Sequence, residues 1–486
     1  MLFNSYVFIL LFMPVTWVIY FFLNGFGCYR VAQVALVAAS FIFYGYYDWR
    51  LCVLLLTTVV VNYAFHLILT QISPGILKKS VLALGIFVNL ALLFYFKYWN
   101  FAFETLYGLL GKDYVMKNIV LPLGISFFTF QQISMLVDSS EPEMERYGFW
   151  EYALFVSFFS QLIAGPIVLH QEMIPQFNDV EKKKANYGNM AIGLEYFVLG
   201  FAKKVLIADY FARICDAGYE NLKQLNSYST MLTILAFTLQ IYFDFSGYCD
   251  MAKGIGKAFN FEIPINFNSP YKALTIAEFW KRWHMTLTRF LTKYLYIPLG
   301  GNRKGKKRTY VNIMIVFSLS GLWHGADWTF IFWGMMHGAL QVLCRVGKNI
   351  IEKIPKCLQW VMTFALINIA WVFFRAEYTR QPFLLMERLI VGGPGLGARE
   401  LVDAGTVMGI VLLEKVLVSG VPDIIRQVWV MLSFVIGVLV CIKMPSSHEM
   451  VEKANKGTAY YAFLGIIFAW AFSCLSEVSK FIYFNF

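Results

Sequence analysis

The sequence predicts an all-α protein that crosses a membrane many times, and two observations support this fold class. Hydrophobic residues make up 59% of the 486 residues and charged residues only 15%, whereas soluble domains carry about 25% charged residues. Apolar segments close to the ~20 residues that a helix needs to cross a hydrocarbon core also recur along the whole chain. We therefore expect one integral membrane domain over residues 1–486, with roughly 11 to 14 membrane helices and some interfacial or re-entrant segments.

Each expected helix follows from one apolar segment, and the segments fall into three parts of the chain. N-terminal helices occupy residues 1–118, a core occupies residues 119–345, and C-terminal helices occupy residues 346–486. No basic residue precedes the first segment, so it is expected to be a retained helix and not a cleaved signal peptide. The segments are 6–23, 31–46, 51–69 and 81–98 in the first part; 119–137, 150–169, 191–210, 231–245 and two within 310–344 in the second; and 358–374, 407–418, 428–442 and 459–475 in the third.

Proline and glycine interrupt two of these segments. The sequence LPLG at residues 121–124 lies in one, and AGP at residues 164–166 lies in the other. Such interruptions occur in membrane proteins where the backbone lines a cavity. The positive-inside tendency leads to the same expectation. If the basic residues at 78–79 and 182–184 all face the cytoplasm, one of the segments that begin at 81, 119 and 150 cannot cross fully.

The net charge of +11 indicates membrane topology and not nucleic-acid binding, because the basic residues fall in short loops between apolar segments. Loops at 182–184, 253–308 and 345–356 are expected on the cytoplasmic side. The eight cysteines are scattered singly, a pattern that argues against a disulfide framework, a zinc site or a redox motif. We expect no metal.

His324 is the first candidate for chemistry, because it lies in the sequence GLWHGADW inside an apolar stretch that has no structural need of an imidazole. Ionisable groups inside membrane segments usually mark pathways or chemistry, although a packing histidine bonded to a carbonyl is the alternative. Residues 310–344 would form roughly 52 Å of helix, less than the about 60 Å that two full crossings need. With a turn at residues 325–327, His324 lies at the tip of this short hairpin. His337 lies partway back and need not share its site.

Aromatic and charged residues alternate between residues 240 and 308, the least lipid-like part of the chain. The sequence WKRW at residues 280–283 suits an amphipathic helix at the headgroup boundary, so an interfacial belt is the structural interpretation. Asp244 and Asp250 differ, because a carboxylate at the end of an apolar span costs a few kcal/mol unless it is paired. Arg or Lys partners from the following segment are expected, either to hold the fold or to serve a site.

Residues 298–308 (PLGGNRKGKKR) join a glycine pair to a basic run. Glycines let backbone amides approach an anion, and Lys or Arg supply charge, so the loop suits phosphate. The spacing is not that of a Walker sequence. Nucleotide contact and a cytoplasmic topology anchor explain the loop equally well.

Four motifs together resemble the membrane-bound O-acyltransferase (MBOAT) family, and within it the bacterial alginate O-acetyltransferase-like branch. They are DFSGY at 244–248, EFWKRWH at 278–284, YIPLGGNR at 296–303 and LWHGA at 322–326, the last followed by WG at 333–334 and HG at 337–338. The resemblance runs from about residue 121 to residue 340, and includes PLGISF at 122–127 and AGPI at 164–167. After Asp138 the sequence reads SSEPE where the branch has a Val-Tyr-Arg-Gly-like stretch. A partner contact of that loop is therefore not supported.

The resemblance implies a helical bundle around a central tunnel, in which an acyl group passes from a cytoplasmic thioester to an extracytoplasmic acceptor. His324 matches the essential histidine of the family, and His284 matches the histidine of its second motif. Acyl transfer to a hydroxyl needs a group that takes the hydroxyl proton, and an imidazole with a pKa near ~6.5 suits that step. We expect His324 to be this base, and His284 with nearby Asn or Gln side chains to orient substrate. Substrate contacts are expected from Asp244, Ser246, Asp250, Trp283, Asn302, Arg303, Trp323 and Asp327.

The branch also implies acetyl-CoA as donor, an extracytoplasmic polysaccharide as final acceptor, and a partner protein of the SGNH-hydrolase-like kind with its own catalytic serine. A multi-pass protein of a bacterial inner, or cytoplasmic, membrane is expected. Two other functions fit the same residues: D-alanyl transfer toward teichoic acid from a carrier-protein thioester, and a non-enzymatic scaffold for polysaccharide export in which His324 packs or gates. Coenzyme A release, carrier-protein dependence and the state of the secreted polymer in a His324→Ala strain separate the three.

Overall fold

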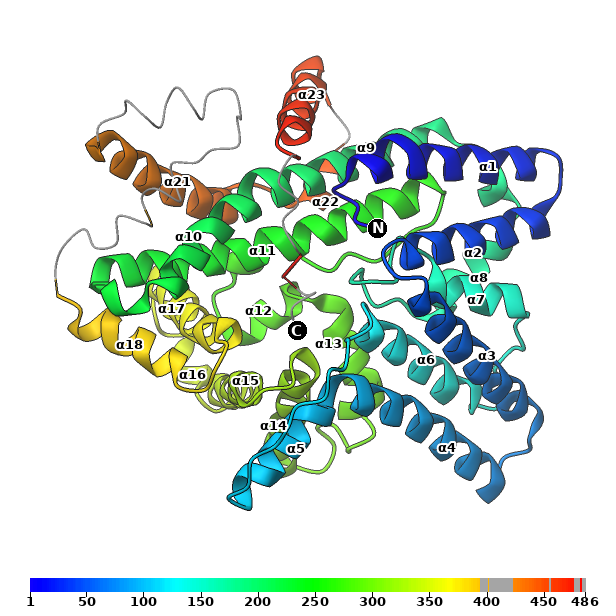
Figure 1. Ribbon diagram of the computed structural model, residues 1–486, viewed down its shortest axis with the longest axis horizontal. Coiled ribbons are helices and arrows are strands. Elements are labelled where there is room, and N and C mark those ends of the chain that lie inside the picture. The colour runs from blue at the N-terminus through cyan, green and yellow to red at the C-terminus, as the bar shows by residue number, and fades with distance from the viewer. Residues whose placement is uncertain (394–400, 402–422, 454–455, 476–480, 483–486) are drawn as a thin grey trace. The chain divides into compact units, whose positions relative to one another are not determined.

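The computed structural model describes residues 1–393, 401, 423–453, 456–475 and 481–482, and every regular element in those ranges is a helix (Figure 1). The predicted all-α class is confirmed. The chain divides into two compact units: unit 1 is Met1–Phe197 with Met251–Pro264, and unit 2 is Val198–Asp250 with Ile265–Phe486. These boundaries differ from the three predicted parts, and the single membrane domain stays a prediction.

Unit 1 follows the predicted apolar segments closely. Its helix α1 packs on α2, and α6 packs on both α3 and α4. Most side chains of α6 are buried. The elements are a π-helical turn Phe8–Phe12, α1 (Met13–Gly25), α2 (Tyr29–Gly45), α3 (Arg50–Gln71), α4 (Ile76–Leu93), a π-helical turn Phe94–Tyr98, α5 (Trp99–Leu109), α6 (Ile125–Ser139), α7 (Phe149–Ser157), α8 (His170–Asn178) and the first part of α9 (Tyr187–Ala202).

Among the described residues, four helices are long and apolar enough to cross a membrane: Phe8–Gly25, Arg50–Gln71, Ile76–Leu109 and Lys356–Arg375. They coincide with the segments predicted at 6–23, 51–69, 81–98 and 358–374. Three further apolar helices, Tyr29–Gly45, Gln427–Lys443 and Thr458–Ser473, are shorter. Membrane-type helices are therefore present at these predicted positions, while the number of crossings stays a prediction. The segment predicted at 407–418 lies outside the described residues.

The two Gly-Pro interruptions lie outside helices, as predicted. Helix α6 begins only at Ile125, after Gly124 with a φ of +73°, a left-handed conformation that glycine adopts without strain. A Cβ at Gly124 would lie 2.8 Å from the carbonyl oxygen of Leu162, so two irregular segments approach each other through this glycine. Helix α7 ends at Ser157, and residues 158–169 form turns and extended chain. Neither predicted segment is one continuous helix.

A buried polar network fastens the loop that follows α6. Ser139 Oγ lies 2.8 Å from Nδ1 of His66, whose Nε2 accepts from the backbone N–H of Tyr147 at 3.2 Å. The hydroxyl of Tyr147 lies 3.2 Å from Nδ1 of His170, whose Nε2 lies 3.0 Å from Asp138. Both imidazoles therefore have partners on both nitrogens, as buried polar groups require. At the point where the chain departs from the alginate branch, these contacts hold the loop to α3 and α8.

Unit 2 contains the hairpin that the sequence predicted. Helix α14 (Lys306–His324) ends and α15 (Trp328–Val346) begins on either side of the expected turn at residues 325–327. Each is 19 residues long, or about 28 Å. The remaining elements are a π-helical turn Lys203–Ala208, α10 (Asp209–Glu220), α11 (Ser227–Ala258, through Asp250), α12 (Ile276–Arg282), α13 (Met285–Leu291), a π-helical turn Thr292–Tyr296, α16 (Lys348–Ile351), α17 (Lys356–Arg375), α18 (Gln381–Val391), α21 (Asp423–Lys443), α22 (Ser447–Glu452) and α23 (Thr458–Ser473).

Glycines bring α14 and α15 into backbone contact. A Cβ added to Gly334 would lie 2.3 Å from the carbonyl oxygen of Phe317, and one added to Gly321 would lie 2.2 Å from that of Phe330. Small residues allow membrane helices to approach this closely. The contact fixes the last turn of α14, where His324 lies.

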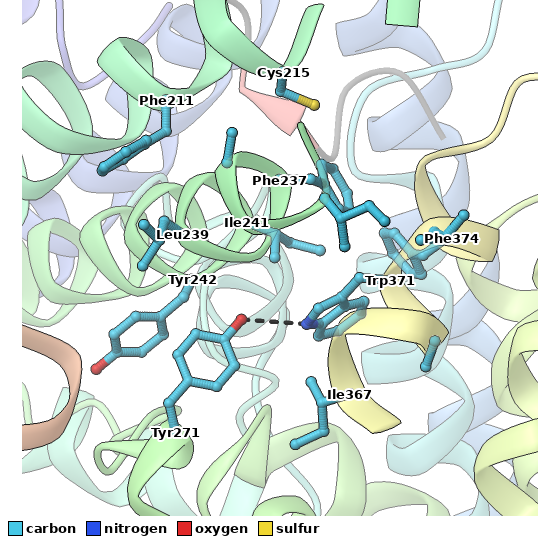
Figure 2. Close-up of a cluster of buried hydrophobic side chains, with 14 of the residues drawn as sticks. Phe211, Cys215, Phe237, Leu239, Ile241, Tyr242, Tyr271, Ile367, Trp371 and Phe374 are labelled. Atoms are coloured by element: carbon cyan, nitrogen blue, oxygen red, sulfur yellow. Dashed lines mark hydrogen bonds between the residues drawn. The ribbon is translucent and has the colours of Figure 1, made fainter. Parts of the chain in front are cut away.

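A cluster of buried aromatic and aliphatic side chains fills unit 2 (Figure 2). The hydroxyl of Tyr271 donates to the carbonyl of Thr238 at 2.7 Å and accepts from the indole N–H of Trp371 at 3.2 Å, the bond that Figure 2 draws as a dashed line. Trp333 of α15 stacks on Trp371 of α17, with ring centroids 5.9 Å apart. Phe374, on the same helix as Trp371, packs against both indoles. This cluster forms the rigid wall of the site described next.

Candidate active site

His324 ends α14 with its ring enclosed by aromatic side chains. Its ring centroid lies 5.0 Å from that of Trp333 and 5.3 Å from that of Phe374. The neighbouring Trp323 lies 4.9 Å away. Only 3% of His324 is exposed. The histidine predicted at the tip of a hairpin therefore sits in an enclosure built from α14, α15 and α17.

His284 lies between α12 and α13, two seven-residue helices that are too short to span a membrane. Its φ is 44°, a left-handed conformation that costs free energy in residues other than glycine and is found preferentially at functional sites. Nδ1 of His284 lies 3.2 Å from Oδ1 of Asn266, and the ring packs edge-on to Phe245 at 4.8 Å. Burial lowers the pKa of His284 to about 3, so the ring is neutral at physiological pH.

The two predicted catalytic histidines lie close together. The ring centroids of His284 and His324 are 6.2 Å apart, and Trp323 contacts both rings. Two imidazoles in one apolar enclosure can take and return a proton where water is excluded. His337, which the sequence gave no reason to place nearby, also packs on Trp333, at 4.9 Å.

The two predicted substrate carboxylates take part in ion pairs. Asp244 pairs with Lys204 at 2.8 Å, and Asp250 pairs with Lys203 at 2.6 Å. Both lysines lie in the π-helical turn Lys203–Ala208, before the aspartates in the chain. The expectation that the partners come from the following segment was wrong. Because α11 runs unbroken from Ser227 to Ala258, the aspartates lie within the helix and not at its end.

These carboxylates also receive hydrogen bonds from the C-terminal part of the chain. The backbone N–H of Ile482 donates to Asp244 at 2.8 Å, and the hydroxyl of Ser447 donates to Asp250 at 2.7 Å. Ser246, between them on α11, is 1% exposed. The contacts of the two aspartates join α11 to the π-helical turn Lys203–Ala208 and to the C-terminal part of the chain. A role in binding substrate stays a prediction for all three residues.

Residues 280–283 do not form an interfacial belt, and that interpretation was wrong. Trp280 and Trp283 are 4% and 1% exposed and belong to the aromatic cluster of unit 2. Trp283 packs on Trp371 at 5.0 Å. Trp280 lies in α12, and Trp283 directly follows the last residue of that helix. Both indoles are buried in the protein interior, while Arg282 pairs with Glu278.

The remaining predicted contacts lie at opposite ends of α14. Asn302 and Arg303 are exposed in the loop before α14, roughly 27 Å of helix away from His324. Asp327 follows α14 and caps α15, because its side chain accepts from the backbone N–H of Thr329 at 2.8 Å. The structure gives Asp327 a capping role, and the basic loop does not share the enclosure of the histidines.

Sequence reasoning missed Asn266, the side chain that binds His284. It also missed Phe245, Trp371 and Phe374 as walls of the site, because contacts between distant segments leave no periodic signal. The sequence did contain a cue for Asn266, a polar residue in the run IPINFNSPY just before the second motif. Within the described residues there is no group of three or more His, Cys, Asp or Glu side chains that could hold a metal ion.

The family follows from comparison of the sequence with known proteins. The model of the membrane-bound O-acyltransferase family, MBOAT, matches residues 41–377. This chain belongs to the MBOAT family. The family resemblance predicted from the four motifs is confirmed, and with it the assignment as an acyltransferase.

The MBOAT chain has relatives that match along most of its length. It is 40% identical to "Peptidoglycan O-acetyltransferase" of Helicobacter pylori, with 100% of this chain and 98% of that protein aligned. It is 38% identical to "Probable alginate O-acetylase AlgI" of Pseudomonas aeruginosa, over 81% of this chain and 75% of that protein. A more distant relative is "Teichoic acid D-alanyltransferase" of Streptococcus thermophilus, 26% identical over 44% of this chain.

Proposed function

We propose that this MBOAT protein moves an acetyl group from cytoplasmic acetyl-CoA to a hydroxyl of an extracytoplasmic glycan. The observation that carries the proposal is the buried pair His284 and His324, with ring centroids 6.2 Å apart inside aromatic walls. Acyl transfer needs proton transfer at the attacking hydroxyl, and this pair supplies it. The names of the relatives with the widest alignment support acetyl as the group and a cell-envelope glycan as acceptor.

The proposed reaction needs no redox partner. The acceptor O–H bond breaks as its oxygen bonds to the thioester carbonyl carbon, and the carbon–sulfur bond then breaks. The proton that the histidine pair takes from the hydroxyl passes to the departing coenzyme A thiolate. The apolar enclosure favours this exchange, because charge that develops there interacts strongly with nearby dipoles.

The basic loop at residues 300–308 is the proposed contact for the nucleotide phosphates of acetyl-CoA. It is exposed, and it precedes α14. Arg303 offers the bidentate donors that phosphate favours, and Asn302 lies beside it in the chain. Donor phosphates held at this end of α14 would leave the thioester to extend along the helix toward His324. The loop then faces the cytoplasm, as the positive-inside tendency predicts.

The proposed setting is the cytoplasmic membrane of a bacterium, with several passes and lipid around the apolar helices. The direct acceptor is either the glycan itself or a serine of an SGNH-hydrolase-like partner that passes the acetyl group on. The relative that aligns over 98% of its length acts, by its name, on peptidoglycan. Peptidoglycan is therefore the acceptor to test first.

The test is transfer from radiolabelled acetyl-CoA by purified protein in lipid nanodiscs. We expect coenzyme A release in the presence of glycan or partner, label on that acceptor, and a loss of at least about 10²-fold in His324→Ala. His448→Ala, at an exposed histidine of α22, is the matched control. Unchanged transfer by His324→Ala at normal protein level contradicts the site. Transfer of D-alanine from a carrier-protein thioester, without acetyl transfer from acetyl-CoA, favours teichoic acid D-alanylation. Transfer from neither donor favours an export scaffold.

A further inference from the structure

The hydrogen bonds around Asn266 reveal which nitrogen of His284 carries the proton. Oδ1 of Asn266 lies 3.2 Å from the backbone nitrogen of Thr286 and 3.0 Å from its hydroxyl. A backbone N–H only donates, so the atom that faces it must be the amide oxygen. The same oxygen lies 3.2 Å from Nδ1 of His284. Nδ1 therefore carries the hydrogen, and Nε2 of the neutral ring is left with a lone pair.

This lone pair is buried without a partner. His284 is 0% exposed, and its Nε2 has no hydrogen-bond partner among the described residues. An unsatisfied buried acceptor costs free energy, and native structures keep few of them. In unit 1, by contrast, His66 and His170 have partners on both nitrogens. In the described part of unit 2, Nε2 of His337 is also buried without a partner, and the unsatisfied nitrogen of His284 is the one on the ring that lies beside His324.

A third buried histidine, His337, carries its hydrogen on the other ring nitrogen. The indole N–H of Trp280 donates to Nδ1 of His337 at 3.2 Å. An indole N–H only donates, so His337 carries its hydrogen on Nε2. The lone pair on Nε2 of His284 is thus a consequence of Asn266 and not a general property of the buried histidines of unit 2.

We propose that Asn266 is a positioning residue that holds His284 in the Nδ1–H tautomer, so that Nε2 of His284 is the atom that accepts the proton of the attacking hydroxyl. The proposal rests on the proposed acyltransferase function and revises the sequence prediction, which gave this role to His324. In the step, the O–H proton moves to Nε2 as the hydroxyl oxygen bonds to the carbonyl carbon. The carbon–sulfur bond breaks, and Nε2 returns the proton to the thiolate. The Nδ1–H bond to Asn266 is kept throughout.

Asn266 is held rigidly enough for this role. Its side-chain amide nitrogen donates to Sγ of Cys249 at 3.3 Å, its side-chain oxygen accepts from the backbone N–H of Thr286 at 3.2 Å, and its backbone carbonyl accepts from the backbone N–H of Met285 at 3.0 Å. Both ends of the side-chain amide therefore have partners, and rotation of the amide would place its NH₂ against the N–H of Thr286. A fixed partner on one ring nitrogen is the usual means by which proteins select a histidine tautomer.

The first experiment reads the tautomer without any activity. ¹⁵N-histidine labelling of the protein in membranes gives few signals, because the chain has six histidines, and His284→Asn identifies the signal that belongs to His284. We expect an Nδ1–H tautomer in wild type and in Thr286→Val, which removes another donor from the same oxygen. Asn266→Leu should convert it to the Nε2–H form. An Nε2–H signal in wild type refutes the proposal whether or not the protein transfers acetyl groups.

The second experiment measures coenzyme A release across pH. His284→Asn keeps an amide donor toward Asn266 but removes the accepting nitrogen, so kcat should fall by about 10²- to 10⁴-fold. The kcat of Asn266→Leu should fall by a similar factor, and the kcat of Thr286→Val should stay near that of wild type. Asn266→Asp keeps the acceptor and adds negative charge, which raises the pKa of His284. The kcat of Asn266→Asp should therefore stay near that of wild type, and the acid limb of its pH–rate profile should move to higher pH.

The two hypotheses fail in distinguishable ways. If wild type releases no coenzyme A, the proposed function fails, while the NMR signal still decides the tautomer. If wild type is active and Asn266→Leu is folded, fully active and unchanged in its pH profile, Asn266 does not position the base. A loss of activity in Asn266→Asp equal to that in Asn266→Leu, without a displaced profile, indicates a purely structural residue and also refutes the proposal.

Discussion

Replacing Gly334 by alanine tests whether the backbone contact between α14 and α15 sets the position of His324. The new Cβ would lie 2.3 Å from the carbonyl oxygen of Phe317 and 3.0 Å from Cα of Gly321, where ordinary contact begins at 3.4 Å. The obstruction is backbone and cannot rotate away, so the helices must separate by about 1 Å. Overpacking of this kind costs about 1–3 kcal/mol, and a displacement of ~1 Å at a reacting group can reduce the rate about 10²-fold.

The assay is thermal unfolding of the purified protein together with coenzyme A release at a fixed protein concentration. Gly465→Ala is the matched control, because Gly465 lies in α23 and an added Cβ there meets nothing within 4 Å. We expect Gly334→Ala to unfold at a lower temperature and to lose most of its activity, and Gly465→Ala to keep both. If the two variants behave alike in both measurements, the close helix contact does not control the site.

Three further outcomes follow from the structure. Lys204→Met leaves Asp244 as a buried charge that has lost its 2.8 Å partner. It should lower the free energy of unfolding by about 3–5 kcal/mol. The double variant Lys204→Met with Asp244→Leu should recover much of this loss, which thermal unfolding measures. Asp327→Ala should lower the free energy of unfolding by about 1 kcal/mol through loss of the α15 cap, and Asp327→Ser should keep the cap and the stability. If Asp327→Ser is as stable as wild type but loses acetyl transfer, Asp327 contacts substrate. Arg303→Ala should raise KM for acetyl-CoA about tenfold with kcat unchanged, as loss of one charge-assisted phosphate contact would, whereas the exposed Lys348→Ala should not; equal KM values would place the nucleotide elsewhere.

Much of the fold could be predicted from local sequence. Helices α1 to α4 and α17 coincide with apolar segments, because the length of an apolar run alone meets the requirement for a membrane helix. The turn at residues 325–327 was placed correctly, because glycine and an Asp that caps a helix mark such boundaries. Helix α11 was cut short at residue 245, because its polar residues, including Asp244, look like the end of a span when their buried lysine partners are not visible.

The candidate site, too, could be predicted from the sequence only in part. The motifs identified His284 and His324, and chemistry made an imidazole in an apolar helix conspicuous. Sequence reasoning assigned the proton-accepting role to His324, which stays a prediction beside our proposal for His284. It also took Trp283 for an interfacial residue, which was wrong. The neighbours behind these two differences are far away in the chain: Asn266, which faces His284, and Trp371, which packs on Trp283.

By itself, the sequence determined that the chain is a helical membrane protein of an acyltransferase type and which histidines are the candidates for its chemistry, because hydrophobic run length and motif identity are local properties. Only the tertiary structure decided which lysines neutralise Asp244 and Asp250, that glycines bring α14 and α15 together, and that Asn266 faces His284. These are pairings between distant segments. Their energies depend on distance, burial and hydrogen-bond direction, and no local pattern of residues encodes those quantities.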